Sequence, residues 1–395
     1  MITFTKESTL RNNCFGCSAC QNVCILGSIT MVQDDEGFLY PLTNEQTCIS
    51  CGKCENACPA LSKHENGFKF EVPFVYAAIN KDEDVRRSSS SGGIFTVLAE
   101  HIFKDGGVVF GAGFDKDFNV MHKYADNIKQ LEELKGSKYV QSQIGSTYRQ
   151  AEEFLIQGMQ VLFSGTPCQI AGFKGYLGRE FNNLLTCDIV CHGVPSPKIY
   201  KMYLDYVSQN NSSSIDKINF RDKKKGWKRF SLSIKFKDER IYTSDLTADP
   251  YLYGFLKNLY LRPSCHICPF TNINRISDIT LGDYWGVAKY HPKMDDDRGA
   301  SIVLINTEKG KEIFEKYKSL LNYIQSNIDW AITGNACLVK PCDSHKSREN
   351  FFRALNSQPF GKVLNKYMLP YSLFFRVIKK IILFGKRALK QSQLK

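Results

Sequence analysis

Short apolar runs alternate with polar turns along residues 74–190. Residues 94–103 place apolar side chains at positions 94, 95, 98, 102 and 103, which is helical spacing, and a second helix is predicted over about 145–157. Four apolar runs have the length and composition of buried strands: residues 74–79, 108–114, 161–165 and 184–190. The polar residues 60–72 predict a linker ahead of the first strand.

The N-terminal part of the chain lacks this pattern and is organised by cysteines. Cys14 and Cys48 each begin a run of the form C-x2-C-x2-C-x3-C. In two-cluster ferredoxins the first three cysteines of such a run bind one iron–sulfur cluster and the fourth ligates the other. A pair of zinc knuckles is the alternative, but structural zinc sites often include histidine. No histidine lies among these eight cysteines.

Crossed ligation assigns the eight cysteines to two 4Fe–4S clusters. The first set is Cys14, Cys17, Cys20 and Cys58, and the second set is Cys24, Cys48, Cys51 and Cys54. Ile25 stands after Cys24 where the ferredoxin pattern has proline, which loosens one turn without removing a ligand. About the first 65 residues thus resemble a bacterial two-cluster ferredoxin.

Three separate places in the chain supply enough cysteines for one more four-thiolate site: Cys168, Cys191, Cys265 and Cys268. Cys168 follows the strand predicted at 161–165 and begins a helix, where the dipole favours a thiolate that acts as a nucleophile or metal ligand. Zinc stays open beside iron here, because His192 and His266 neighbour these cysteines. Cys187 could compete for this site, but on one strand it would lie about 13 Å from Cys191, so it is interpreted as a buried core thiol. Cys337 and Cys342 have no close partners in the sequence and are interpreted in the same way.

Two small polar loops offer backbone N–H groups to an anion. Residues 86–93 run from two arginines through four serines to two glycines, and they open into the helix predicted at 94–103. Unpaired N–H groups and the positive end of the dipole make such a helix start a phosphate site. An ordinary serine N-cap is the alternative. The basic loop 135–142 is a second candidate for a phosphate or ribose group.

Length and composition predict two or three globular domains, with 395 residues, 43% hydrophobic and 23% charged. The opening residues lack a secretory h-region, so we expect a cytoplasmic protein whose 15 cysteines are metal ligands and free thiols. The net charge of +12 suits an acidic protein, an anionic cofactor or a membrane surface. Nucleic acid is not expected as a partner, because no recognition motif appears.

The C-terminal residues 373–387 combine an apolar face with a basic face. Charges break the apolar run well before the roughly 20 residues that a membrane-spanning helix needs. One interpretation is a helix lying on an anionic membrane, at the inner face of the cell membrane. The other is a helix that docks onto the protein's own core.

Beyond residue 72 the chain resembles the family of beta subunits of coenzyme F420 hydrogenases and dehydrogenases. The motifs that carry this resemblance span about residues 74–345. They are Ser91-Gly-Gly, Gly136-Ser-Lys-Tyr139, Gly165-Thr-Pro-Cys-Gln169, Cys191-His-Gly-Val-Pro-Ser196, Phe220-Arg-Asp-Lys223, Cys265-x-x-Cys268 and Gly282-Asp-Tyr-Trp285. The resemblance implies FAD and a further 4Fe–4S cluster, which favours iron over zinc at the third cysteine set.

The fold class expected from these observations is α+β, with a small two-cluster ferredoxin-like domain before a larger mixed α/β core that binds flavin and a cluster. The expected domains are residues 1–65 for the ferredoxin unit, 73–185 and 186–345 for the N-terminal-type and C-terminal-type domains of these beta subunits, and 346–395 for a basic amphipathic tail.

The resemblance implies an iron–sulfur flavoprotein oxidoreductase that passes electrons from a ferredoxin-type donor through 4Fe–4S clusters to FAD and a small organic substrate. Polysaccharide synthesis is one setting in which relatives are met. The expected FAD-binding residues are Ser90, Ser91, Gly92, Gly93, Ser137 and Lys138, and the expected proton relay is His192 or Asp283. The alternative is an electron-transfer subunit without its own substrate, docked on a partner subunit of a larger redox complex.

Overall fold

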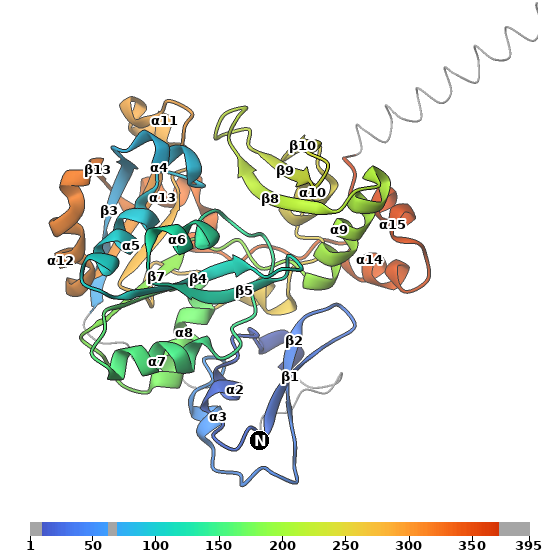
Figure 1. Ribbon diagram of the computed structural model, residues 1–395, viewed down its shortest axis with the longest axis horizontal. Coiled ribbons are helices and arrows are strands. Elements are labelled where there is room, and N and C mark those ends of the chain that lie inside the picture. The colour runs from blue at the N-terminus through green and yellow to red at the C-terminus, as the bar shows by residue number, and fades with distance from the viewer. Residues whose placement is uncertain (1–9, 62–68, 371–395) are drawn as a thin grey trace, which may run out of the picture.

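The computed structural model describes residues 10–61 and 69–370. The amphipathic segment predicted at 373–387 lies outside the described residues. Figure 1 shows a small N-terminal unit packed against a larger core with two sheets. Within the described residues, no helix is both long and apolar enough to cross a membrane.

The N-terminal unit, residues 10–61, consists of short elements separated by the cysteine loops. Its helices and strands are α1 (Leu10–Asn13), α2 (Ala19–Val23), β1 (Ile29–Gln33), β2 (Leu39–Thr43) and α3 (Lys53–Asn56), with β1 and β2 antiparallel. The residues that precede α2 and α3, Ser18 and Gly52, adopt left-handed φ angles of 58° and 73°. This conformation favours small residues, and it turns the chain sharply between consecutive cysteines.

An eight-stranded sheet forms the centre of the core, in the order β13-β3-β12-β11-β7-β6-β4-β5. Its strands are β3 (Lys69–Asn80), β4 (Val108–Phe114), β5 (Val120–Ala125), β6 (Val161–Gly165), β7 (Leu184–Ile189), β11 (Ile279–Asp283), β12 (Ser301–Thr307) and β13 (Leu321–Ser326). The neighbours β4, β6, β7 and β11 run parallel, and the outer pairs are antiparallel. All four strands predicted from the apolar runs are confirmed.

Helices cover both faces of this sheet. One face packs against α5 (Ile94–Lys104), α6 (Ile128–Leu134) and α12 (Glu308–Tyr317), and the other packs against α7 (Thr147–Ile156) and α8 (Pro167–Leu177). The helices predicted near 94–103 and 145–157 are therefore present. The linker predicted at 60–72 is shorter than expected, because β3 begins at Lys69 and Phe70 packs against the core.

A second hydrophobic core surrounds the three-stranded sheet β10-β9-β8. This subdomain contains β8 (Ile215–Asp222), β9 (Ser231–Phe236), β10 (Ile241–Asp245), α9 (Pro197–Asn211), α10 (Pro250–Leu256), α14 (Arg348–Leu355) and α15 (Phe360–Tyr367). Phe351 and Val363 are fully buried there. The described part of the expected tail is thus packed, and the large sheet runs across the expected boundary between residues 185 and 186.

Remaining short elements connect these layers. They are α4 (Glu83–Ser88), η1 (Pro263–Ile267), α11 (Val287–Tyr290), η2 (Pro292–Met294), η3 (Lys318–Leu320), α13 (Ile328–Gly334) and η4 (Ala336–Leu338).

Arg262 fastens the N-terminal unit to the core. Its fully buried guanidinium donates from Nε to the Cys14 carbonyl at 2.7 Å and from Nη2 to the Leu39 carbonyl at 3.0 Å. A third bond runs from Nη1 to Gln141 Oε1 at 3.2 Å. A second attachment of the unit is the ion pair between Glu36 and Arg348 of α14. The position of the cysteine loops relative to the sheet is therefore set by buried polar contacts.

Candidate functional site

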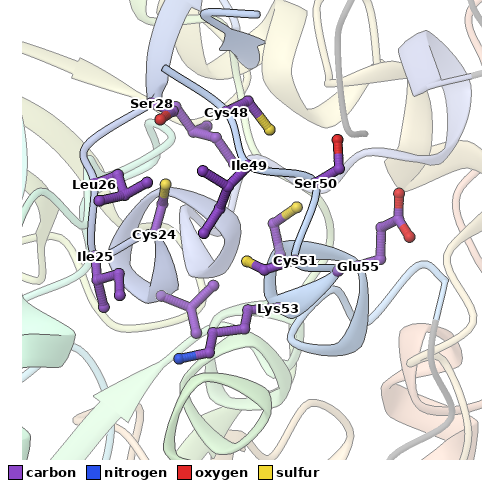
Figure 2. Close-up of a pocket in the computed structure, with 14 residues that line it drawn as sticks. Cys24, Ile25, Leu26, Ser28, Cys48, Ile49, Ser50, Cys51, Lys53 and Glu55 are labelled. Atoms are coloured by element: carbon purple, nitrogen blue, oxygen red, sulfur yellow. The ribbon is translucent and has the colours of Figure 1, made fainter. Parts of the chain in front are cut away.

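The second set of cysteines predicted from the sequence surrounds one pocket of the N-terminal unit. The pocket holds about 110 Å³, and Cys24, Cys48, Cys51 and Cys54 all line it. Figure 2 shows the sulfurs of Cys24, Cys48 and Cys51 around this space, with Ile49 between them. Cys24 comes from the first cysteine run and the other three come from the second, as crossed ligation requires. We call these four cysteines the outer set.

The other four N-terminal cysteines, here called the inner set, are Cys14, Cys17, Cys20 and Cys58. Burial raises the pKa values of Cys17, Cys20 and Cys58. Neighbouring thiols of the same set raise each of these pKa values further. Cys58 also packs against Cys20 in one small cluster with Ile29. The Gly16 N–H also donates to Cys14 Sγ at 3.4 Å. Bound metal would replace the thiol protons and remove the cost of holding these groups together.

The third set, Cys168, Cys191, Cys265 and Cys268, also converges. Burial is the largest cause that raises the pKa of Cys191. The nearby thiols of Cys265, Cys168 and Cys268 raise it further. Burial likewise raises the pKa of Cys168 to about 12, and Cys268 raises it further. Val194 N–H donates to Cys265 Sγ at 3.4 Å. Four thiols from three separate segments thus lie near one another.

Sheet topology explains why this third set assembles. The parallel strands β6, β7 and β11 end at Gly165, Ile189 and Asp283, on one edge of the sheet. Cys168 and Cys191 follow the first two of these strands within three residues. The carboxyl edge of parallel strands is where open α/β sheets bind ligands.

The inner and third sets are joined by direct packing. A Cβ added at Gly172 would lie 2.7 Å from Cys17 Sγ, so α8 passes directly over the inner set. Cys168 belongs to the first turn of the same helix. Phe15, beside Cys14, packs edge-on against Phe270 with ring centroids 5.2 Å apart. The three cysteine sets consequently form a series of contacts, here called the line. Cys20 of the inner set packs with Cys24 and Cys54 of the outer set, and Cys17 packs against the helix that carries Cys168.

Cys337 and Cys342 correct one interpretation of the sequence. We expected buried core thiols without close partners, but both are half-buried beside the third set. Cys337 Sγ lies 3.6 Å from His192 Nδ1, and Cys342 Sγ lies 3.8 Å from His266 Nδ1. More than 70 residues separate each thiol from its histidine in the chain, and spacing gave no signal of the contact. Cys187 is a buried core thiol as expected.

The two loops predicted to bind an anion meet in space. Ser137 donates from its backbone N–H to Ser90 Oγ at 2.7 Å, and the two hydroxyls lie 3.0 Å apart. Gly92 fits tightly beneath them, because an added Cβ would lie 2.4 Å from the Ala78 carbonyl oxygen. Gly93 has a φ angle of 84° and begins α5. Ser90, Ser91, Gly92, Gly93 and Ser137 therefore belong to one small surface at a helix start.

Lys138 belongs to the same loop but its amine is occupied elsewhere. It donates to the carbonyls of Glu133, Leu134 and Lys135, at 3.0, 3.0 and 2.9 Å, and so caps the C-terminal end of α6. Burial lowers the pKa of Lys138 to about 7. The structure thus gives Lys138 a role in holding the loop, and does not direct its charge at the Ser90 surface.

Arg221 is the cation that the sequence did not single out at this surface. Its Nη2 donates to the Ser90 carbonyl at 3.2 Å and to Asp283 Oδ1 at 2.8 Å, while its buried Nε has no hydrogen-bond partner. Lys223 supports the same loop by donating to the carbonyls of Arg86 and Ser91. Arg221 lies in the Phe220-Arg-Asp-Lys223 motif, which was the only signal for it in the sequence.

The two residues expected to relay a proton lie in different surroundings. Asp283 Oδ1 accepts from Arg221 and also from Trp227 Nε1 at 2.8 Å, and Trp227 stacks on Trp285 with centroids 4.6 Å apart. His192 lies beside the third set, where its Nε2 is 2.6 Å from Asn258 Oδ1. Burial lowers the pKa of His192.

Comparison with known families agrees with both parts of the structure. Residues 75–148 match the N-terminal model, and residues 158–326 the C-terminal model, of the family described as "Coenzyme F420 hydrogenase/dehydrogenase, beta subunit". Residues 13–61 match a "4Fe-4S dicluster domain". The chain therefore belongs to the family of coenzyme F420 hydrogenase/dehydrogenase beta subunits and carries an iron–sulfur domain at its N-terminus. Both expectations from the sequence are confirmed.

One curated relative is a subunit of the F(420)H(2) dehydrogenase of Methanosarcina mazei, 22% identical over 326 residues, which are 79% of this chain and 84% of the relative. A chain of the F420-reducing [NiFe] hydrogenase complex from Methanosarcina barkeri is 18% identical, with a TM-score of 0.46. That match covers 75% of this chain and 97% of the other. By its family models, the chain is an iron–sulfur member of an oxidoreductase family.

Proposed function

We propose that this protein takes single electrons from a ferredoxin-type donor and passes them to FAD, which reduces a small organic substrate. The observation that supports this most is the line of three cysteine sets. The outer set opens to the surface, Cys17 of the inner set touches α8, and the third set begins in the first turn of that helix. Iron–sulfur clusters held by these sets would carry single electrons toward the sheet edge.

Iron suits these sets better than zinc. A zinc ion holds its ligands within about 2.3 Å of a single point. The outer set lines a pocket of about 110 Å³, which leaves room for more than a single ion. We propose twelve ligands for three 4Fe–4S clusters, four from each of the outer, inner and third sets.

The Ser90–Gly93 surface fits the phosphates of FAD. Gly93 begins α5, where N–H groups and the helix dipole favour an anion. Gly92 lets the loop pack closely against Ala78, and its own N–H donates to Ser301 Oγ. Arg221, whose Nη2 donates to the Ser90 carbonyl, adds positive charge at the same surface. When bound, FAD accepts electrons singly and delivers a hydride. Ser137 and Arg221 would orient the anion, and Lys138 would hold the loop.

Proton supply is assigned to His192 in this proposal. The Asp283 carboxylate already accepts two hydrogen bonds and balances the Arg221 charge. Asn258 Oδ1 accepts from His192 Nε2, which leaves Nδ1 to take a proton from the Cys337 thiol 3.6 Å away and pass it on. Asp283 then acts as a positioning residue for Arg221.

A second candidate function is an electron-transfer subunit without its own substrate, in a larger redox complex. The Methanosarcina mazei relative favours this alternative, because its name makes it one subunit of a dehydrogenase. Polysaccharide synthesis is the setting that the first candidate takes from the resemblance. Isolation of the chain in a stable complex with a larger catalytic protein would favour the second candidate.

Anaerobic mixing with a reduced two-cluster ferredoxin tests the first candidate directly. We expect the wild-type protein to show loss of its flavin absorption band as electrons arrive. Cys168→Ala should retain the N-terminal iron but lose flavin reduction, whereas Cys187→Ala, which changes a buried thiol outside the three sets, should behave like wild type. Unchanged iron content and flavin reduction in Cys168→Ala would contradict the assignment of the third set.

A further inference from the structure

Three large apolar side chains are exposed on the rim of the outer pocket. Ile25 is 76% exposed, Ile49 is 68% exposed and Leu26 is 51% exposed. All three line the pocket that contains the outer cysteine set. Figure 2 shows Ile25 and Leu26 beside Cys24, and Ile49 between Cys48 and Cys51. Single exposed apolar residues are common on proteins, but these three are gathered around one site.

This rim surrounds the cysteine set that a partner can approach. Cys51 is exposed, while Cys17 and Cys20 of the inner set are each only 8% exposed. The inner set is also covered by α8, as the contact between Gly172 and Cys17 shows. A redox protein that docks on the core side cannot reach the inner set, whereas one that docks on the rim meets the outer set first.

We propose that Ile25, Leu26 and Ile49 form the docking rim for a small ferredoxin that donates electrons to the outer set. The inference rests on the proposed function for the identity of the donor. Each encounter transfers one electron, so that the ferredoxin is oxidised and the outer cluster reduced by one electron, and no bond is made or broken.

The size and charge of the rim favour a transient carrier over a permanent subunit. Interfaces of redox encounters are small, below about 1,200 Å² in total, whereas permanent subunits bury about 2,000 Å² or more. Three apolar side chains with one charge of each sign beside them, Lys53 and Glu55, match the small class. The contact should therefore depend on apolar complementarity more than on net charge.

Stopped-flow mixing with a reduced bacterial two-cluster ferredoxin measures the docking. The readout is the bleaching of this protein's cluster absorption, which requires no flavin or substrate. We expect Ile25→Glu and Ile49→Glu each to lower the second-order rate constant at least tenfold. In Ile25→Glu, reduction by dithionite, a small molecule that needs no docking surface, should stay at the wild-type rate, and iron content should not change.

Two exposed isoleucines elsewhere provide matched controls. Ile156 at the end of α7 is 64% exposed and Ile267, between Cys265 and Cys268, is 57% exposed. Ile156→Glu should leave the rate unchanged. Ile267→Glu tests the rival route, in which the ferredoxin docks at the third set, and a loss of rate there with a normal rate in the rim variants would overturn the proposal.

A charge reversal separates apolar contact from electrostatic attraction. Ile49→Lys should slow the reaction as Ile49→Glu does, because both place a charge where an apolar side chain packs. A faster reaction with Ile49→Lys, or wild-type rates in all rim variants, would contradict the apolar rim. The docking experiment measures cluster bleaching alone. If the rim variants react at the wild-type rate, flavin reduction is still testable with dithionite as the donor. If the flavin is not reduced, the measured rates of cluster bleaching still test the docking rim.

Discussion

The N-terminal cysteine sets and the third set gather the same kind of ligand by two different routes. In the N-terminal unit, eight cysteines lie between Cys14 and Cys58, and local turns at Ser18 and Gly52 bring them together. The third set depends on the order of strands in the large sheet, which brings Cys168 and Cys191 to one edge, and on η1, which adds Cys265 from a distant part of the chain. The first arrangement is a local unit, and the second exists only in the completed fold.

Among the changes considered, removal of a cysteine that takes part in crossed ligation should have the largest effect on electron flow. Cys58 lies in the second cysteine run but belongs to the inner set, so Cys58→Ala should abolish transfer from the outer set to the core. We expect a loss of about four irons per chain and a drop in flavin reduction of about a hundredfold or more, because one of the clusters in the line is missing. Iron analysis and rapid mixing with ferredoxin measure both.

Cys24→Ala is the matched variant, because Cys24 lies in the first run but belongs to the outer set. It should impair reduction by ferredoxin while the inner and third sets keep their iron and remain reducible by dithionite. If Cys24→Ala instead removed the inner cluster and Cys58→Ala the outer one, each run would hold its own cluster and the crossed assignment would be wrong.

Replacement of Arg262 should weaken the attachment of the N-terminal unit to the core. Arg262→Met leaves the Cys14 and Leu39 carbonyls and the Gln141 amide without their buried donor, and charged hydrogen bonds of this kind contribute about 1.5–3 kcal/mol each. We expect the free energy of unfolding to fall by about 3 kcal/mol, together with slower transfer from the inner to the third set. Denaturant unfolding and freeze-quench spectroscopy measure these two effects.

Arg229→Met controls for the loss of one positive charge, since Arg229 is exposed. It should alter stability by less than about 0.5 kcal/mol. Equal effects of the two arginine variants would show that Arg262 does not fasten the N-terminal unit.

Replacement of Arg221 tests the proposed flavin-binding surface of the core. Arg221→Met removes a buried cation that contacts Ser90, so the dissociation constant for FAD should rise at least tenfold, equivalent to about 1.4 kcal/mol. Arg87→Met, which changes an exposed arginine near the same loop, should have no measurable effect. Titration of flavin-depleted protein with FAD measures the affinities, and an unchanged value for Arg221→Met would remove this residue from the proposed site.

Lys138 should give the smallest effect, visible as a pH dependence. Burial lowers its pKa from 10.5 to about 7, so between these values the unfolded chain binds a proton that the folded chain has released. The free energy of unfolding of wild type should therefore rise relative to Lys138→Met as pH increases from about 7 to 10.5. Denaturant unfolding at several pH values measures the difference in the free energy of unfolding between wild type and Lys138→Met. A constant difference across this pH window would contradict the claim that burial disfavours the charged form of the Lys138 amine.

The contrast between the regions also explains which features were predictable. Local patterns suffice for the cysteine runs, for the four predicted strands and for the start of α5, because these depend on residues close together in the chain. The sequence also placed Gly92 and Ser137 in small loops, and the structure brings these two loops into contact.

Contacts created by the sheet order were not predictable from spacing. Strand β11 inserts between β7 and β12, which brings Asp283 to Arg221. Lys138 was expected to be an anion ligand because its loop is basic, but only the structure shows that its amine caps α6. Cys337 and Cys342 were misinterpreted for the same reason, since their histidine neighbours are distant in sequence.

Iron and flavin content per chain, measured on protein purified without oxygen, tests the central claim most directly. The account predicts about 12 irons and one FAD per chain, from three four-iron clusters and one flavin site. About 8 irons without flavin would contradict it, because only the N-terminal unit would then be loaded. The protein would in that case serve as an electron-transfer subunit whose partner supplies the chemistry.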